Sequence, residues 1–293
     1  MSQTVLVLGS RGLLGAHLVN ELRSNNHRVI GQSRERGTEI IGNPLDKLSL
    51  RKMIELSRPD VIVNLIAMTD VDGCQLKPDE AYKLNVELPG LLSEVCSHLD
   101  SGIRVVSIST DHVYESNVGA TESDVTLRNI YALTKKWGEE RSLCYPRTTV
   151  FRTNFVGKSI STKKSWTDWL VKVSEESISQ TIFRDQFFNP ISIGSLCREL
   201  EREVSSPRFG LYNLGANGAL SKYEFANRFL TGLGLSTDSI VGKSYFEGTF
   251  TTPRPSSMVM DVKLYEKTRS VTLPKIENEI HSIIREYLDA SAK

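Results

Sequence analysis

A glycine-rich turn near the N-terminus constrains the fold of this chain more than any other feature. Residues 4–8 form a continuous apolar run, residues 9–15 carry glycines in the spacing GxxGxxG, and apolar residues then recur with helical spacing from Leu14 to Leu22. Such an apolar run is typical of a strand that is covered on both faces. A strand, a glycine turn and a helix in this order form the context of a dinucleotide-binding site.

Glycines in this turn would let the backbone approach a pyrophosphate closely. The N-terminus of the following helix would add N–H donors and the positive end of the helix dipole. The alternative is a tight strand–helix turn that binds no ligand. The position and spacing of Gly9, Gly12 and Gly15 favour a cofactor site, with Arg11 as a further contact.

The end of the second predicted strand, residues 27–32, indicates which cofactor is bound. A carboxylate at this point would bind the ribose 2′-OH of NAD. Here Gln32 is followed by Ser33 and Arg34, and a guanidinium suits a 2′-phosphate. NADPH is therefore favoured, and NADH remains possible. Alternatively, Arg34 and Arg36 are only solvated loop charges, and Glu35 weakens the indication of a 2′-phosphate further.

Apolar runs alternate with amphipathic segments through the first half of the chain, which predicts an α/β fold with a Rossmann-type, doubly wound parallel sheet. The pattern changes after Thr153. We expect an NAD(P)-binding domain over residues 1–155. Residues 156–293 should form mainly a smaller α/β substrate-binding domain, with some segments returning to the first. Strands are predicted over residues 4–8, 27–32, 61–67, 104–109, 148–152 and 210–214. Helices are predicted over residues 16–22, 47–57, 79–96, 131–144, 166–176, 195–204, 222–233 and 275–288. Loops are predicted over residues 119–129 and 159–165, and we expect the second loop to be mobile and to lie over the site.

Tyr131 and Lys135 are four residues apart in a predicted helix and therefore share one face of it. A nearby ammonium favours the phenolate, so Lys135 should lower the pKa of Tyr131 and make it a usable proton donor. The spacing alone is common, and most instances are solvated helix faces. Thr110 follows the predicted strand 104–109 and offers a hydroxyl where a substrate carbonyl would sit. His112 is a lone histidine for which we expect a packing or hydrogen-bonding role.

Composition argues against several classes of protein. The formal net charge of +1 gives no indication of nucleic-acid or membrane-surface binding. No stretch approaches the roughly 20 apolar residues of a membrane span, and the start lacks the pattern of a signal peptide. The four cysteines are scattered without CxxC pairing, which predicts buried thiols, no metal site and a reducing, cytoplasmic setting.

Taken together, the motifs resemble those of the extended short-chain dehydrogenase/reductases, and more narrowly the dTDP-4-dehydrorhamnose reductase family. The resemblance spans nearly the whole chain, and its motifs occur in the family's order. They are residues 9–15, 58–64, 67–72, 109–114, 131–135 with Gly138 and Glu139, 151–153, 184–186 with Pro190, 212–214, 223–226, and Arg254 and Pro255 with Ser257 and Asp261.

The resemblance implies NADPH- or NADH-dependent reduction of the C4 ketone of a nucleotide-linked deoxysugar. Tyr131 would donate the proton to the carbonyl oxygen, Lys135 would assist it and bind the nicotinamide ribose, and Thr110 would hydrogen-bond the same carbonyl. The implied substrate-side residues are Thr69, Asp111, Phe155 and Arg254. The implied cofactor contacts are Gly9, Arg11, Gly12, Leu13, Leu14, Gly15, Ser33, Arg34, Asn43, Ile66, Ala67, Tyr131 and Lys135. The oligomeric state stays open, with a homodimer as one option.

Several positions depart from the family pattern. His112 replaces an aromatic residue, commonly Tyr, and Phe155 replaces a Trp that packs on the sugar. Phe188 and Ile191 replace a small Gly and a Thr. The remaining departures are Ala132 for Gly, Leu127 for Pro and Asn43 for an Asp near the adenine. We expect these changes to cluster on the substrate side and to leave the identity of the sugar open.

Two other functions fit the same motifs. The regulatory subunit of methionine adenosyltransferase resembles this family and acts mainly as a binding partner, and it can retain Thr110, Tyr131 and Lys135. A related nucleotide-sugar epimerase is a further alternative. A dehydratase normally carries an acid/base pair after the catalytic Thr, often Asp-Glu. Asp111 is followed here by His112, so dehydration is less favoured.

Overall fold

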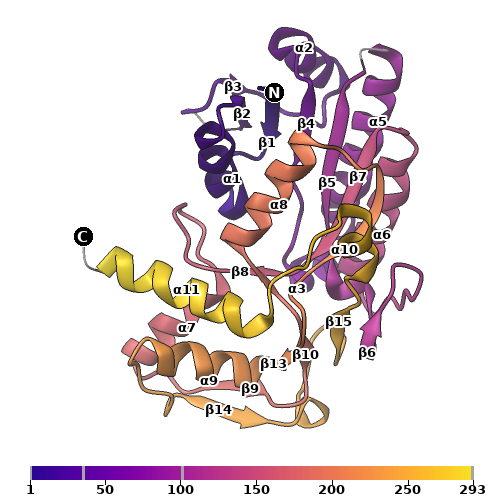
Figure 1. Cartoon of the computed structure of the whole chain (residues 1–293). Helices are drawn as coiled ribbons and strands as arrows, with labels where there is room; N and C mark the ends of the chain where they lie inside the picture. The colour runs from indigo at the N-terminus through magenta and orange to yellow at the C-terminus, as the bar shows by residue number, and fades with distance from the viewer. Residues whose placement is uncertain (1, 35–36, 100–101, 292–293) are drawn as a thin grey trace.

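Seven parallel strands form the central sheet of the protein (Figure 1). The computed structural model describes residues 2–34, 37–99 and 102–291. The strands follow the order β12-β7-β5-β4-β1-β2-β3, and each neighbouring pair is parallel. The predicted doubly wound α/β fold is therefore confirmed. The strands are β1 (Thr4–Leu8), β2 (Arg28–Ser33), β3 (Ile40–Ile41), β4 (Val61–Asn64), β5 (Arg104–Thr110), β7 (Thr148–Thr153) and β12 (Gly210–Leu214).

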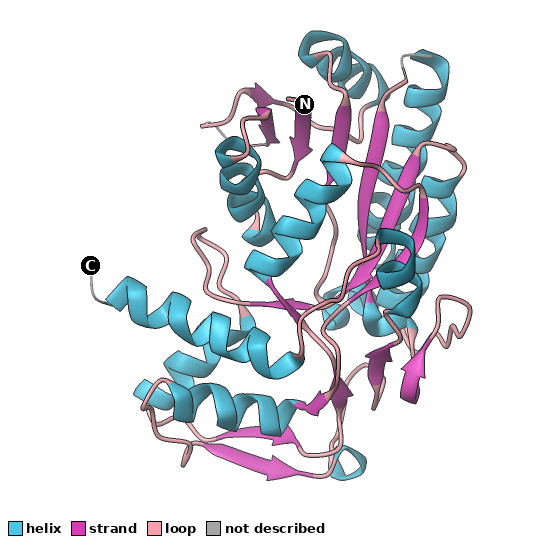
Figure 2. Ribbon diagram, viewed as in Figure 1, coloured by secondary structure: helices cyan, strands magenta, loops and turns pink. Residues whose placement is uncertain are grey.

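Helices cover both faces of this sheet (Figure 2). Because side chains alternate along a strand, Val5 and Val7 of β1 pack against one layer of helices, and Leu6 and Leu8 pack against the other. The continuous apolar run of β1 is explained by this double burial. The first layer contains α1 (Leu13–Ser24) and α8 (Ile193–Ser205), and the second contains α2 (Lys47–Ser57) and α5 (Leu88–Leu99).

The connection of the strands places a crevice at the carboxyl edge of the sheet. From β1 the chain continues to β2 and β3 on one side, then crosses to β4 on the other side of β1. Ligands of open α/β sheets bind where the strand order reverses in this way. β4 ends at Asn64 rather than at the predicted Ala67, so residues 65–70 form a loop at this crevice.

The helical region predicted over residues 79–96 is helical but not uniform. It contains α4 (Pro78–Tyr82), a π-helical turn η1 (Lys83–Glu87) and then α5. Pro89 lies in the first turn of α5, where its missing N–H costs little. The π turn brings its backbone very close to helix α6 (Ile130–Leu143), since a Cβ on Gly138 would lie 1.9 Å from the Asn85 carbonyl oxygen.

A second lobe lies below the sheet in Figure 1, and its side chains form a hydrophobic core of their own. Its centre contains Phe188, Phe225 and Phe229, all of which are buried. Among the described residues, no helix combines the length and apolar character needed to span a membrane. The elements of this lobe include α7 (Trp166–Glu175), β9 (Gln180–Phe183), β10 (Phe187–Phe188), β13 (Leu220–Ser221), α9 (Lys222–Gly232), β14 (Ile240–Lys243), η3 (Tyr245–Glu247) and α11 (Ile276–Ser291).

Segments from the second half of the chain return to the sheet. β12 pairs with β7, and α8 packs on α1. We therefore propose the two-domain division at residue 155, with α8, β12 and α10 (Lys263–Arg269) as the returning segments. The sequence also did not predict several short elements: α3 (Val71–Leu76), η2 (Asp111–Val113), β6 (Ser116–Ala120), β8 (Phe155–Val156), β11 (Ile191–Ser192) and β15 (Met258–Met260).

β6 corrects the prediction of a loop that starts at Gly119. Residues 116–120 pair in parallel with residues 258–260 of β15. The loop prediction failed because a short polar strand has little local signal, and its hydrogen bonds come from a remote part of the chain.

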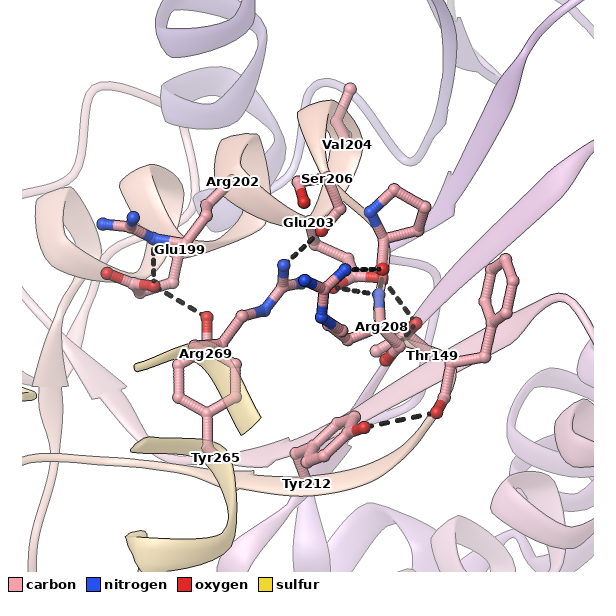
Figure 3. Close-up of polar contacts among 12 residues, drawn as sticks. Thr149, Glu199, Arg202, Glu203, Val204, Ser206, Arg208, Tyr212, Tyr265 and Arg269 are labelled. Carbon is pink, nitrogen blue, oxygen red and sulfur yellow. Dashed lines mark hydrogen bonds and ion pairs between the residues drawn. The ribbon is translucent and has the colours of Figure 1, made fainter. Parts of the chain in front are cut away.

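A buried polar cluster joins α8 and α10 at the amino-terminal side of β7 (Figure 3). Arg269 forms an ion pair with Glu203, and the two side chains are 3% and 1% exposed. The Thr149 hydroxyl donates to Glu203 at 2.6 Å, and the Arg208 backbone N–H donates at 3.0 Å. These residues hold α10 against the sheet at the edge opposite the crevice.

Candidate active site

The glycine turn connects β1 to α1 at the carboxyl edge of the sheet. Gly9 adopts a φ of +79°, which favours glycine, and its N–H donates to the Gln32 carbonyl oxygen at 3.1 Å. A Cβ on Gly15 would lie 2.3 Å from the Gly9 carbonyl oxygen, so the helix packs directly on the turn. Gly12 caps α1 without a side-chain hydrogen bond, and the first turn holds no acidic residue. Within the described part of the chain, the N-cap residue of α1 thus supplies no side-chain acceptor for the first N–H groups of the helix, which suits an anionic ligand.

A cavity of about 740 Å³ lies beside this turn. Residues at or just beyond the carboxyl ends of β1, β2, β4, β5 and β7 line it. Every predicted cofactor contact borders this one cavity: Gly9, Arg11, Gly12, Leu13, Leu14, Gly15, Ser33, Arg34, Asn43, Ile66, Ala67, Tyr131 and Lys135. The predicted residues therefore come together in space, although they span more than a hundred positions of the chain.

Three of the four predicted substrate-side residues also line this cavity, namely Thr69, Asp111 and Phe155. Arg254 does not border it. Its guanidinium donates to the Asp72 carboxylate at 2.8 Å, and both side chains are partly exposed. A substrate-binding role for Arg254 stays a prediction that would require exchange of this ion pair.

Thr110, Tyr131 and Lys135 meet at one wall of the cavity. Thr110 ends β5, and Tyr131 and Lys135 lie on α6, which begins after Asn129. The Asn129 side chain accepts the Ala132 N–H at 2.8 Å and caps the helix. The Thr110 hydroxyl lies within hydrogen-bonding reach of the Tyr131 phenol. The three predicted catalytic groups are thus held by one strand end and one capped helix.

The protonation of Tyr131 differs from the sequence expectation. Burial raises the pKa of the Tyr131 phenol, and the nearby Asp111 and Cys74 raise it further, while the Thr110 hydrogen bond opposes this shift. The predicted lowering by Lys135 is absent from this structure. The reason is that the phenol is only 8% exposed, and desolvation disfavours its charged form.

Lys135 is directed toward the sheet. Its Nζ donates to the Ile108 carbonyl oxygen at 2.6 Å. Burial lowers the pKa of the Lys135 ammonium to about 8, and the Glu139 carboxylate opposes this shift. Lys135 therefore carries its charge at neutral pH and holds it at the wall of the cavity.

The end of β2 carries Gln32 and Ser33, where a protein that binds NAD would have a carboxylate for the ribose 2′-OH. Gln32 is fully buried, and its side-chain amide donates to the Gly42 carbonyl oxygen at 2.7 Å. Ser33 and Arg34 line the cavity. Glu35 and Arg36 lie outside the described residues.

Some residues of the site were missed by sequence reasoning. Thr162 and Lys163 line the cavity, and the Lys163 ammonium donates to the Thr69 hydroxyl at 3.4 Å. The polar, basic character of residues 159–165 was the signal for this contact, since it predicted a loop over the site. The Asn154 side-chain amide donates to the Asp111 carboxylate at 2.7 Å, and burial raises the pKa of the Asp111 carboxyl to about 6.

Within the described ranges, His, Cys, Asp and Glu form no group of three or more that could hold a metal ion.

Residues 3–289 match the family model described as RmlD substrate binding domain. The chain belongs to this family. The prediction of an extended short-chain dehydrogenase/reductase related to dTDP-4-dehydrorhamnose reductase is confirmed.

Known RmlD-family relatives resemble the chain over most of its length. It is 28% identical over 268 residues to the spore coat polysaccharide biosynthesis protein SpsK of Bacillus subtilis, with 90% of each chain covered. It is 25% identical over 294 residues to the methionine adenosyltransferase 2 subunit beta of Xenopus laevis, covering 91% of this chain and 82% of the relative. The crystal structure of dTDP-4-dehydrorhamnose reductase from Bacillus anthracis, in complex with NADP, matches with a TM-score of 0.88. The match covers 98% of this chain and 100% of the other at 20% identity, and it supports the fold alone.

Only some departures from the RmlD-family pattern touch the cavity. Phe155 and His112 line it, and the His112 ring meets the Tyr131 ring edge-on with centroids 5.4 Å apart. Phe188 and Ile191 are 1% and 0% exposed and belong to the hydrophobic cores. The expectation that these two residues shape the substrate side is therefore wrong, because both side chains pack inward.

Proposed function

We propose that the chain is an NADPH-dependent reductase of the C4 ketone of a nucleotide-linked deoxysugar, such as dTDP-4-dehydrorhamnose, and that it serves polysaccharide biosynthesis. The observation that carries this proposal is the convergence of Thr110, Tyr131 and Lys135 on the cavity that begins at the glycine turn. A proton donor, its neighbours and a pyrophosphate-binding turn share one cavity of about 740 Å³. That volume lies within the range of ordinary cofactor sites.

The cofactor side of the cavity fits a phosphorylated dinucleotide. The uncapped N-terminus of α1 would bind the pyrophosphate, and Gly15 leaves the required space. Ser33 and Arg34 would bind the 2′-phosphate, and the buried Gln32 offers no carboxylate to repel it. When bound, the nicotinamide supplies the hydride.

The protein residues would deliver the proton. Thr110 and Tyr131 would both hydrogen-bond the carbonyl oxygen, so charge that develops there meets donors already in place. The raised pKa of Tyr131 keeps the phenol protonated until hydride addition creates an alkoxide. An alkoxide is a far stronger base than a phenolate, so the transfer stays downhill. Lys135 would stay charged at the same wall of the cavity when the phenolate forms.

A cofactor-oxidation assay against a panel of nucleotide 4-keto sugars tests this function. Wild-type protein should oxidise NADPH with at least one of them, and Tyr131→Phe should lose about 10²- to 10⁴-fold in kcat, the usual contribution of a general acid. NADPH affinity should stay nearly unchanged. Tyr82→Phe is the matched control, because Tyr82 is 42% exposed and packs only edge-on against Trp137. Unchanged turnover of Tyr131→Phe contradicts the assignment.

The second candidate function is a regulatory subunit. The similarity to the methionine adenosyltransferase 2 subunit beta favours it. Two results together would favour this function: a pull-down recovers a catalytic partner, and the protein reduces no sugar of the panel.

A related epimerase would instead interconvert sugars with no net consumption of NADPH. Cytoplasmic location and a possible homodimer are part of the proposal, and gel filtration tests the dimer.

A further inference from the structure

A buried ion pair lies behind α6 and takes no part in the chemistry proposed above. Glu139 and Arg152 are 2% and 0% exposed. Arg152 donates to both Glu139 carboxylate oxygens, at 2.8 Å from Nε and at 2.6 Å from Nη2. The Ser109 hydroxyl donates a further bond to this carboxylate at 2.5 Å. A buried pair costs so much desolvation that stability alone is a weak reason for its presence.

The Glu139 end of the ion pair lies one turn of α6 from Lys135. Glu139 follows Lys135 by four residues, so the two side chains share one face of α6. Both are fastened to neighbouring residues of β5: the Lys135 ammonium to the Ile108 carbonyl oxygen, and the Glu139 carboxylate to the Ser109 hydroxyl. The ammonium and the carboxylate therefore cannot shift independently along the sheet.

Glu139 is the described anion that acts on Lys135. Tyr131 shares this face of α6, and the titratable groups that raise the pKa of the ammonium are Glu139 from α6 and Cys74 from α3. Burial raises the pKa of the Cys74 thiol to about 11, so it is neutral at neutral pH. From β5 the Ile108 carbonyl accepts the ammonium proton, and Arg152 of β7 faces Glu139 rather than Lys135.

Arg152 keeps the carboxylate in this place. One of its terminal nitrogens, Nη1, donates to the Tyr114 hydroxyl and to the Glu122 carbonyl oxygen, both at 2.7 Å. Tyr114 donates in turn to the Asn213 side chain at 2.6 Å. The guanidinium is thus bound on both sides, which holds the Glu139 carboxylate in this place.

We propose that Glu139 is a positioning residue of the reaction. It keeps the Lys135 ammonium charged and fixed against β5, and it thereby sets the upper pH limit of turnover. This inference rests on the proposed function, because it assigns Glu139 a part in the same reaction.

The first test is the pH profile of Glu139→Gln. Its alkaline limb in kcat should move to lower pH by about one unit, because Lys135 loses the charge that opposes the effect of burial. Glu140→Gln is the matched control on the same helix. Glu140 is exposed and pairs with Lys136 at 2.7 Å, so its loss should leave the limb in place. A profile of Glu139→Gln that coincides with that of the wild type overturns the proposal.

A double variant separates positioning from stability. Glu139→Gln alone leaves Arg152 poorly paired and should lower the melting temperature. Glu139→Gln combined with Arg152→Met removes both charges and should recover much of that loss. A purely structural role predicts that the alkaline limb recovers together with the melting temperature. Our proposal predicts that the alkaline limb of the kcat profile stays at lower pH in the double variant.

The ionisation of Lys135 can also be measured without turnover. Competitive labelling with acetic anhydride as a function of pH, read by mass spectrometry, gives the apparent pKa of this lysine. The pKa should fall in Glu139→Gln and stay constant in Glu140→Gln. An unchanged Lys135 pKa overturns the inference whether or not the protein reduces sugars. A lowered pKa in a protein that oxidises no NADPH supports the effect of Glu139 and overturns the proposed reductase instead.

Discussion

Replacing Gly15 with Ala tests whether the close packing of α1 on the glycine turn creates the cofactor site. The new Cβ would lie 2.3 Å from the Gly9 carbonyl oxygen and 2.8 Å from the Ser10 Cα. The shorter distance falls about 1.1 Å short of the 3.4 Å at which ordinary contact begins. Both neighbours are backbone atoms, so neither can rotate away, and the N-terminus of α1 has to move.

The size of the effect follows from this displacement. Overpacking of this kind costs about 1–3 kcal/mol of stability. Moving the first N–H groups of α1 by roughly 1 Å also weakens their hydrogen bonds to a charged pyrophosphate, each worth about 1.5–3 kcal/mol. Loss of one such bond raises the Kd for NADPH about ten- to a hundredfold.

Fluorescence titration with NADPH and urea unfolding measure the two effects separately. Gly232→Ala is a matched control, because its Cβ would lie equally close, 2.3 Å, to the Ile284 Cδ1 atom. That atom ends a flexible side chain in the second core, so this variant should keep the wild-type Kd. An unchanged NADPH affinity in Gly15→Ala would refute the reasoning.

Three further perturbations address stability. Ser165→Ala removes the capping box that Ser165 forms with Asp168 at the start of α7, and should cost about 1 kcal/mol in urea unfolding. Arg269→Met leaves Glu203 buried without its ion pair (Figure 3) and should cost about 3–5 kcal/mol, whereas a milder loss would mean that water reaches the carboxylate. Burial lowers the pKa of His112 from 6.5 to about 3, so the unfolded chain takes up its proton first and stability falls as the pH drops through this window. His112→Phe should lose less stability in acid than the wild type, and equal slopes would contradict this.

Local signals in the sequence were sufficient for most of the sheet and its helices. The bounds of β1, α2 and β12 agree with the prediction. α2 is delimited by Asp46, whose side chain accepts the Ser49 N–H, and by Arg58 in the left-handed conformation. β6 was missed because its pairing with β15 depends on residues 258–260, which no window around residue 116 contains.

The membership of the site was also largely determined by the sequence. Residues at or just beyond the carboxyl ends of parallel strands meet at one edge of the sheet, so Gly9, Ser33, Ala67 and Thr110 were expected to come together once the strands were identified. Lys163 reaches the same cavity through a loop whose course has no strand register to guide a prediction. Asn154 directly follows β7, so its position offered a signal that the sequence reasoning did not use.

The chemical state of the site depends on the tertiary structure. The spacing of Tyr131 and Lys135 is a local property, and it correctly placed both side chains on one helix face. The pKa of Tyr131 is set instead by burial and by Asp111, Thr110 and Cys74, which come from other elements. In the same way, only packing decided that Phe155 faces the cavity while Phe188 lies in a core. Sequence spacing therefore determined which groups meet, whereas desolvation and electrostatics, which sum over remote parts of the chain, determined how those groups are charged and which of them a ligand can touch.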